Sequence, residues 1–253
     1  MQHLIYKLLN KFSSNDAESD ILGYLKKLKK EDKIVFDVGC FRGTFTENLI
    51  KNEQKLGIKS NFFLFDPNPK VKSYLKQLLQ NEKVKYFNFA FDNSSTNKKF
   101  YLNTFMEPAG SSLNPLLRDD KKWAISRKFI MQILQPFKRI GGFSEINVQT
   151  QTLDNFCLSK KIENIDVLKI DTEGNDLNVL KGAKKLLSEN KIKLIYTEIS
   201  STKINFKEKE KNTIDFLNSY NFDLRKIYKN KIFSTLSGLR VTDNLFVNRN
   251  LLH

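Results

Sequence analysis

The chain of 253 residues is long enough for one large domain or for a domain with an extension. Hydrophobic residues make up 40% and aromatic residues 12%, which is enough for a packed core and excludes an intrinsically disordered chain. The formal net charge is +15, from 43 Lys and Arg against 28 Asp and Glu. Because no block of like charges appears, this charge predicts a solvated basic surface, and a basic face for nucleic acid or for an acidic substrate is the alternative.

The cysteines and the start of the chain bear on location. Cys40 and Cys157 lie far apart, so we expect neither a disulfide framework nor a zinc site, and a cytoplasmic location is predicted. The start has no signal-peptide cleavage site, and its apolar pattern is too short to span a bilayer. Five of its apolar side chains have helical spacing: Leu4, Ile5, Leu8, Leu9 and Phe12. We expect this helix to pack on the domain or a partner, with membrane-surface contact as the alternative.

Apolar runs and helical patterns alternate along the chain. In the first half we expect a helix at 18–30, a strand at 33–39, a helix at 44–52, a strand at 61–66, a helix at 70–81, and strands at 84–92 and 98–103. In the second half we expect a strand from 146, strands at 166–171 and 193–200, helices at 175–187 and 208–220, and closing strands at 222–230 and 243–249. This alternation predicts a mostly parallel sheet covered by helices on both faces, with the chemistry along one edge.

Residues 104–147 break this rhythm. They are rich in proline and glycine, contain the only tryptophan, Trp123, and include one helical pattern at 118–135. Long insertions of this kind in compact domains are usually functional, so we expect a cover over the acceptor site. The predicted organisation is an N-terminal helical extension, residues 1–32, and a main domain, residues 33–253, that contains this segment.

The first strand-to-helix turn, "DVGCFRGTFT", contains Asp37, Gly39 and Gly43. Glycines at such a turn allow a sharp bend and a close approach of ligand or helix to the backbone. The spacing fits neither the dinucleotide fingerprint nor a P-loop. A carboxylate at Asp37 would repel a pyrophosphate but suits a ligand with an ammonium group. The alternative is a turn with a purely structural role.

The second turn, "FDPNP", places Asp66 at the end of a strand. An acidic side chain at this position can accept hydrogen bonds from both ribose hydroxyls of an adenosine, and a helix cap is the alternative. An ammonium site at the first turn and a ribose site at the second together describe S-adenosylmethionine.

The ordered motifs "VFDVGCFRGTFT", "FLFDPNP", "NFAFDNSS", "SSL", "VQTQTLDNF", "DVLKIDTEGNDLNVLKGA" and "YTEIS" resemble the FkbM family of methyltransferases. The resemblance runs from about Lys33 to Asn248, and "KIDTEG…VLKGA" is its most specific part. It implies a Rossmann-like class I methyltransferase fold with a mostly parallel seven-stranded sheet. It also implies S-adenosylmethionine as donor and usually O-methylation of a hydroxyl, often on a sugar or another small metabolite.

The resemblance also assigns cofactor residues. Asp37, Gly39, Cys40 and Gly43 match the cofactor loop, and Asp66 matches the ribose-binding acid. The segment that follows the third strand is expected to line the adenine pocket, with three residues there: Asn88, Phe89 and Ala90. The sequence departs from the family at two positions of the loop. Phe41 stands where Asn is common, and Arg42 stands where a smaller or apolar residue is common.

In this fold, the fourth strand of the sheet ends beside the transferred methyl group, which is where Asp171 and Glu173 stand. Asp171 is the expected base or positioner of the acceptor hydroxyl, because a carboxylate within hydrogen-bond reach can take its proton. Glu173 is expected to orient Asp171, hold Lys169 or bind a metal, and Glu198 in "YTEIS" to complete an acidic rim. The alternative is that a helix N-terminus simply favours negative charge there. His3 and His253 lie at the termini and are poor candidates for the base.

Three functions compete at this stage. The first is O-methylation of a sugar, glycan or other small metabolite. The second is methylation of an RNA ribose hydroxyl, for which Lys169, Asp171 and Glu198 would form the site. The third is a non-catalytic adenosine-binding protein on the same fold. A divalent metal such as Mg²⁺ stays open, because the carboxylates of Asp171, Glu173 and Glu198 could supply oxygen ligands.

Overall fold

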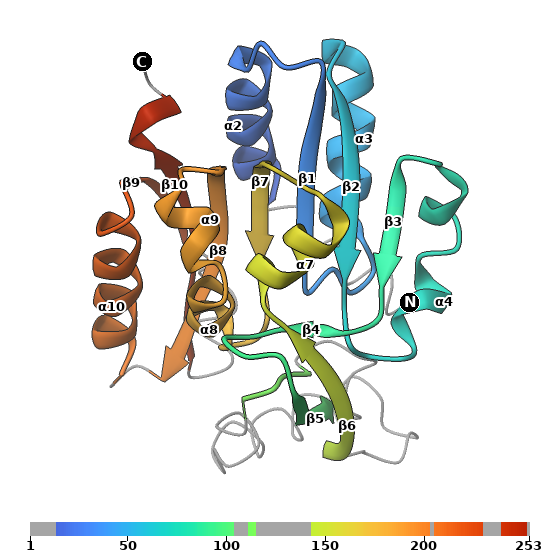
Figure 1. Cartoon of the computed structure of the whole chain (residues 1–253), viewed down its shortest axis with the longest axis vertical. Helices are drawn as coiled ribbons and strands as arrows, with labels where there is room; N and C mark the ends of the chain where they lie inside the picture. Colours follow the sequence, from blue (N-terminus) through green and yellow to red (C-terminus); the bar gives the residue numbers. More distant parts are fainter. Residues whose placement is uncertain (1–13, 104–110, 115–142, 203–204, 230–238, 252–253) are drawn as a thin grey trace.

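The computed structural model describes residues 14–103, 111–114, 143–202, 205–229 and 239–251 (Figure 1). The apolar helix expected at the start of the chain and the helix expected at 118–135 lie outside the described residues. None of the helices in these ranges is long and apolar enough to cross a membrane.

A seven-stranded sheet forms the centre of the molecule. Its strands are β1 (Asp32–Val38), β2 (Lys59–Phe65), β3 (Val84–Phe87), β7 (Ile165–Ile170), β8 (Ile192–Thr202), β9 (Phe222–Lys229) and β10 (Leu239–Asn248). They stand in the order β3-β2-β1-β7-β8-β10-β9. The pairs from β3 to β8 are parallel, and β10 runs antiparallel to both of its neighbours. The predicted seven-stranded, mostly parallel sheet is confirmed.

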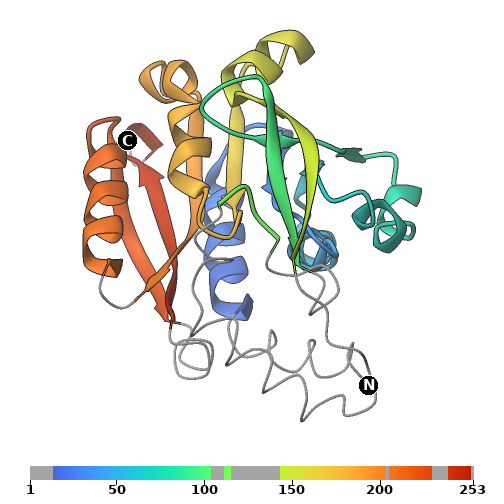
Figure 2. The same cartoon turned by 90° about the horizontal axis from the view of Figure 1, so that it is seen from below.

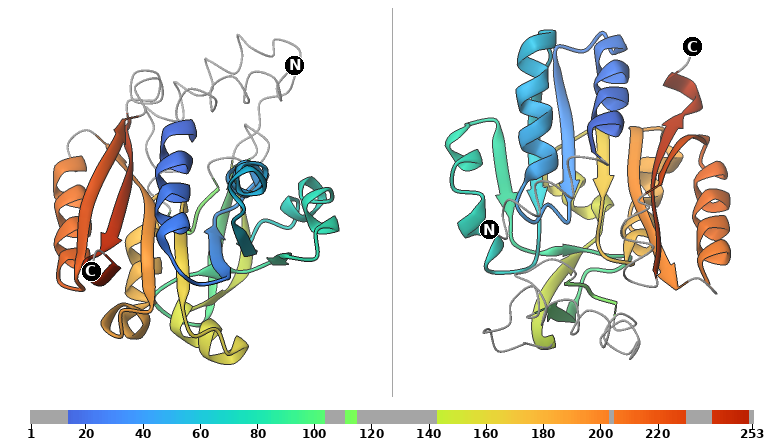
Figure 3. Two further views of the ribbon diagram at one scale, coloured as in Figure 1. Left: turned by 90° about the horizontal axis from the view of Figure 1, so that it is seen from above. Right: turned by 180° about the vertical axis from the view of Figure 1, so that it is seen from behind.

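Helices cover both faces of this sheet. Figure 1 shows four of them on one face: α7 (Leu153–Lys160), α8 (Asp176–Lys181), α9 (Lys184–Ser188) and α10 (Phe206–Asn218). The reverse view in Figure 3 shows α2 (Ser14–Lys27) and α3 (Thr44–Leu56) on the other face. The described part of the predicted N-terminal extension, α2, packs in the domain core, where Ala17, Ile21 and Leu25 are fully buried.

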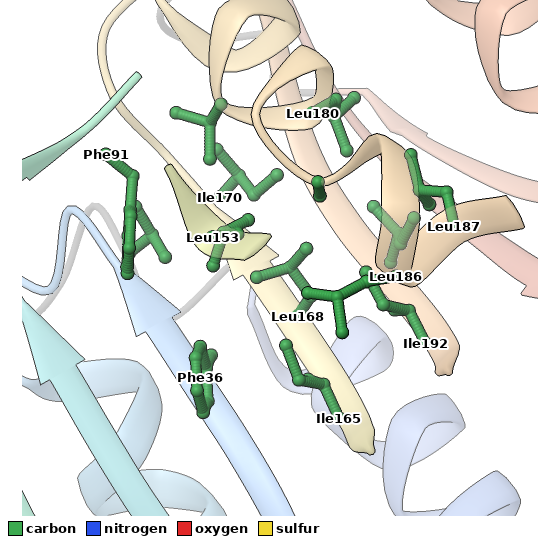
Figure 4. Packing of buried hydrophobic residues seen from close by; sticks show 14 of the residues in the cluster. Phe36, Phe91, Leu153, Ile165, Leu168, Ile170, Leu180, Leu186, Leu187 and Ile192 are labelled. Atoms are coloured by element: carbon green, nitrogen blue, oxygen red, sulfur yellow. The ribbon is translucent and has the colours of Figure 1, made fainter. Parts of the chain in front are cut away.

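Each face has its own hydrophobic core. Alternate residues of a strand point to opposite faces, so that Val167 of β7 packs toward α2 and α3 while Leu168 packs toward α7, α8 and α9. Figure 4 shows the second of these cores, in which Leu168 lies among side chains of α9 and Phe36 lies on β1. All six residues of β7 are buried, as expected for a central parallel strand.

Two expected helices are shorter or divided. The helix expected at 70–81 is a single turn, α4 (Val71–Tyr74), followed by a 3₁₀ turn, η1 (Leu78–Gln80). The helix expected at 175–187 is divided into α8 and α9 at Gly182. A Cβ added at Gly182 would lie 2.2 Å from the carbonyl oxygen of Asp92, so the close approach of another segment requires glycine at this position. The chain closes with a 3₁₀ turn, η2 (Arg249–Leu251).

A second, three-stranded sheet lies at the edge where the parallel strands end (Figures 1 and 2). It consists of β4 (Ala90–Phe91), β6 (Phe143–Gln151) and β5 (Asn97–Asn103), in the order β4-β6-β5. The strand expected at 84–92 is therefore two strands, of which only β3 belongs to the large sheet. The strand expected from 146 is β6, which begins at Phe143, within the expected bounds of the inserted segment.

Candidate active site

The loop between β1 and α3 is tied to both neighbouring strands of the sheet. The backbone N–H groups of Gly39 and Cys40 donate to the carbonyl oxygen of Phe65 at 2.9 and 3.1 Å. Gly39 has a φ of +75°, and a Cβ there would lie 1.9 Å from the carbonyl oxygen of Asp171. Gly43 has a φ of +71°, and a Cβ there would lie 2.4 Å from the side chain of Leu78. Both positions therefore require glycine, and Gly39 lets the loop lie directly against the end of β7.

Phe41, at the first departure from the family pattern, adopts a left-handed backbone. Its φ is +46°, a conformation that favours glycine and asparagine and costs a residue such as phenylalanine about 1–3 kcal/mol. The Arg42 guanidinium lies 5.4 Å from the centre of the Phe41 ring and 4.9 Å from that of Tyr74. The Arg42 side chain is thus accommodated by stacking on the rings of Phe41 and Tyr74.

Asp66 is held in place by two backbone groups. Its Oδ2 accepts from the N–H of Phe41 at 3.1 Å, and its Oδ1 accepts from the N–H of Asn68 at 2.9 Å. Burial raises the pKa of Asp66 to about 6, although these two hydrogen bonds oppose the shift. Each carboxylate oxygen keeps a second lone pair, so the group can still accept hydrogen bonds from a ligand.

A hollow that opens to solvent lies beside Asp66. Its lining combines apolar and polar residues: Val38, Gly39, Phe41, Phe65, Asp66, Pro67, Phe89, Ala90, Phe91, Phe100, Ser111, Leu113, Asp171, Thr172, Glu173 and Asn175. Asn88 supports the wall instead, because its Nδ2 donates to the Asp66 carbonyl at 2.9 Å and to the Tyr86 hydroxyl at 3.0 Å. The hollow therefore brings together the ends of β1, β2, β4 and β7.

Asp37 and Lys169 form an ion pair beneath this hollow. Asp37 Oδ1 lies 3.0 Å from Lys169 Nζ, with 1% and 9% of the two side chains exposed. Asp37 Oδ2 accepts from the Thr46 hydroxyl at 2.9 Å. Burial alone would lower the pKa of Lys169, but the negative charges of Asp37 and Asp171 outweigh it and raise that pKa above its usual value. Asp37 is thus compensated beneath the loop. Cys40 and Cys157 are both buried.

The turn at residues 171–174 carries the two expected carboxylates. Glu173 has a φ of +52° and Gly174 a φ of +97°, so the chain reverses sharply after Asp171. Asp176 closes the turn, because its two carboxylate oxygens accept from the N–H groups of Thr172 and Gly174, both at 3.1 Å. Asp171 and Glu173 line the hollow, and the Asp171 side chain is 41% exposed. We call residues 171–174 the carboxylate turn.

Two further elements hold the carboxylate turn from outside. The Ser112 hydroxyl lies 3.0 Å from the carbonyl oxygen of Thr172 and 2.9 Å from that of Glu173. The Lys209 ammonium, from α10, donates to the carbonyl oxygens of Gly174 and Ser200 at 3.1 and 3.0 Å. Residues 111–114 of the inserted segment therefore rest on the carboxylate turn and contribute to the lining of the hollow.

A second group of acids lies beside Asp171 on the same face of the sheet. Glu198 of β8 is the register partner of Asp243 of β10. Burial and the nearby charges of Asp171 and Glu173 raise the pKa of Glu198 well above its usual value. Burial and the charge of Asp171 likewise raise the pKa of Asp243 to about 7. Glu198 does not line the hollow. Its place in an acidic rim therefore stays a prediction, although Glu198 and Asp243 form an acidic pair on β8 and β10 beside Asp171.

The sequence did not predict three residues that support the site: Asp176, Ser112 and Asp243. Asp176 stands three residues after Glu173 at a helix start, and this position alone was a usable signal for a capping role. Ser112 and Asp243 reach the site only through the pairing of distant segments. Among the described residues, no three His, Cys, Asp or Glu side chains are grouped closely enough to hold a metal ion.

A parallel sheet with one antiparallel strand near its edge, and a glycine turn followed by an acid after the second strand, is the arrangement expected of a Rossmann-like class I methyltransferase. Residues 37–224 match the family profile described as "Methyltransferase FkbM domain". The chain therefore belongs to the FkbM family of methyltransferases, which confirms the resemblance seen in the sequence.

Individual relatives are distant. The chain is 24% identical over 184 residues to the 2-O-methyltransferase NoeI of Sinorhizobium fredii (strain NBRC 101917 / NGR234), a match that covers 70% of this chain and 67% of NoeI. The crystal structure of methyltransferase FkbM from Methylobacillus flagellatus KT is similar with a TM-score of 0.49 and 12% identity. That match covers 87% of this chain but only 45% of the other. Aeropyrum pernix fibrillarin with bound S-adenosyl-L-methionine gives a TM-score of 0.45 and 12% identity, over 89% of this chain and 74% of that one.

Proposed function

We propose that the chain transfers a methyl group from S-adenosylmethionine to a hydroxyl group of a sugar, glycan or other small metabolite, and that the hollow beside Asp66 holds the donor. The observation that carries this proposal is the meeting of Gly39, Asp66 and Asp171 around one cavity at the edge of the sheet. The family indicates the reaction class, and the geometry of the hollow supports this position for the donor.

The adenosine would lie over Asp66. The Asp66 carboxylate is buried, fixed by two backbone N–H groups and directed to the hollow, which suits the two hydroxyls of a ribose. Phe89, Ala90 and Pro67 give the adjoining wall an apolar surface for a base. Gly39 would allow the rest of the donor to pass close to the backbone between the ends of β1 and β7.

The acceptor hydroxyl would approach from the side of the carboxylate turn. S-adenosylmethionine supplies an electrophilic methyl group, and the hydroxyl must lose its proton as its oxygen attacks. Asp171 is the best placed of the expected acids to accept that proton, because it lines the hollow and is partly exposed. Glu173 would orient the acceptor or its neighbour, and Ser111 and Leu113 would form the acceptor-side wall.

The proposal of a hydroxyl acceptor is supported by one relative, since NoeI is named as a 2-O-methyltransferase. A ligand that carries several hydroxyl groups would also suit the polar residues of the lining, which include Asp171, Thr172, Glu173 and Asn175. Methylation of RNA is the alternative outcome of the test.

The test is a methyl-transfer assay with the full chain and labelled S-adenosylmethionine. Mono- and oligosaccharides and total RNA are offered as separate acceptor sets, with and without Mg²⁺ and with a chelator. Label transfer and S-adenosylhomocysteine formation with a saccharide set, and not with RNA, is the expected result. Transfer to RNA alone would refute the acceptor class, and failure to bind S-adenosylmethionine in calorimetry would refute the placement of the donor.

A further inference from the structure

A single buried ammonium group connects the two halves of the site. Lys169 Nζ donates to the carbonyl oxygen of Gly39 at 3.0 Å and lies 3.0 Å from Asp37 Oδ1 and 3.4 Å from Asp171 Oδ2. Gly39 and Asp37 belong to the loop that follows β1, whereas Asp171 begins the carboxylate turn after β7. The contact with Gly39 is a hydrogen bond, and the contacts with Asp37 and Asp171 are ion pairs.

The sheet makes this arrangement possible. Lys169 is the register partner of Asp37 in the parallel β1–β7 pair, so both side chains leave the same face of the sheet. Asp171 lies two residues further along and therefore points to that face as well. Cross-strand pairing thus places the ammonium between the loop and the carboxylate turn, where Gly39 and Asp171 complete its surroundings.

Burial makes the arrangement demanding. The Lys169 side chain is 9% exposed, and a buried cation must be compensated by acceptors that stay in place. Asp37 is equally buried and cannot move away, because the Thr46 hydroxyl also holds it. Asp171 is the one partner of the three with a large exposed fraction, 41%, so its carboxylate can serve Lys169 with one oxygen and an acceptor with the other.

We propose, building on the function proposed above, that Lys169 is a positioning residue that fixes the Asp171 carboxylate against the cofactor loop. It would act through Gly39 and Asp171 and would not itself contact the acceptor. Its charge compensates Asp37, and its geometry keeps the proton acceptor at a set distance from the donor site. The sequence alone favoured a place for Lys169 among the catalytic groups. Its burial beneath the loop supports the positioning role instead.

Two variants separate positioning from mere charge compensation. Lys169→Arg keeps the positive charge that Asp37 needs, but its longer, planar head cannot reproduce the same three contacts. The double variant Asp37→Asn with Lys169→Met removes both charges, so no buried charge is left without a partner. A matched control is Lys30→Met with Asp166→Asn, which removes an ion pair of 3.0 Å that also involves β7, but at the opposite end of that strand.

The readouts are thermal unfolding, affinity for S-adenosylmethionine by calorimetry, and kcat and KM for the acceptor found in the assay above. Positioning predicts that Lys169→Arg and the Asp37/Lys169 double variant fold but lose about 10²-fold in kcat, with a much smaller change in acceptor KM. The control pair should retain the kcat of the unsubstituted chain. A folded Lys169→Arg or double variant with kcat within about threefold of the unsubstituted chain would overturn the proposal, since 1 kcal/mol corresponds to about fivefold.

The two proposals fail separately. If the unsubstituted chain transfers no methyl group to any acceptor, the proposed function fails. If it transfers methyl groups and the Lys169 variants match it, only the positioning role fails. If one of the two variants does not fold, the other decides the question, because Lys169→Arg retains the compensating charge and the double variant needs none.

Discussion

The affinity for S-adenosylmethionine should depend on pH through Asp66. Burial raises the pKa of this carboxyl group from 3.8 to about 6. Above that pH the group is charged and can accept the ribose hydrogen bonds, and below it the group is protonated. If only the ionised form binds well, the dissociation constant should rise about tenfold for each pH unit below 6. An aspartate with its ordinary pKa would leave affinity constant down to about pH 4.

Calorimetric titrations between pH 5 and pH 8, with unfolding checked at each pH, measure this dependence. Asp243 and Glu18, each with a pKa raised to about 7, titrate in the same window and make a control necessary. Asp66→Asn provides it, because this variant has no carboxyl group to titrate at position 66. Loss of a charged acceptor, worth about 1.5–3 kcal/mol, should weaken its binding by about 10- to 150-fold at pH 8. The reasoning is refuted if the unsubstituted chain binds equally well at pH 5 and pH 8, or if Asp66→Asn shows the same slope.

The remaining predictions concern the base, the inserted segment and stability. Asp171→Asn should fold, bind S-adenosylmethionine normally and lose about 10²–10⁴-fold in turnover, whereas Glu173→Gln should lose less. Near-full turnover of Asp171→Asn would show that the role of Asp171 is structural. Ser112→Ala should lower turnover while sparing donor affinity, because the hydroxyl holds residues 111–114 to the carboxylate turn, and equal turnover in steady-state assays would contradict this. Burial raises the pKa of Glu18 to about 7, so its charge destabilises the fold increasingly from about pH 4.5 to pH 7. Glu18→Gln keeps the acceptor for the Asn48 amide. In urea unfolding, this variant should raise the free energy of unfolding by up to about 3 kcal/mol at pH 8 and by little at pH 4.5. An equal gain at both pH values would refute the raised pKa of Glu18.

Much of the fold could be predicted because it depends on local patterns. The stretches that become β1, β2, β7 and β8 each contain a short run of apolar residues and stand before or after turn residues, which is typical of buried parallel strands. The glycines of the first turn and Asp66 could be placed for the same reason, since each stands directly after such a strand. The carboxyl ends of parallel strands share one edge, so their meeting around a hollow followed from topology.

Contacts between distant segments could not be predicted in this way. Gly182 divides a continuous helical pattern because the backbone of Asp92 lies against it, and nothing in the local sequence reveals that neighbour. The end of the third strand turned away from the large sheet to pair Ala90 with Thr150. Asp37 was expected near a ligand ammonium, whereas its side chain pairs with the ammonium of Lys169, and only the register of β1 against β7 makes this visible.

The order of residues in "KIDTEG" follows from these constraints taken together. A strand alternates its faces, so Lys169 and Asp171 share the face of Asp37 while Ile170, between them, enters the opposite core. Insertion of one residue between Lys169 and Asp171 would turn the carboxylate toward that core and away from the ammonium. After Asp171 the chain must leave the sheet beside Gly39, and the left-handed Glu173 and Gly174 make that turn while Asp176 accepts its free N–H groups. The motif is thus a strand end and a turn that place one charged pair under the hollow and one carboxylate in its lining.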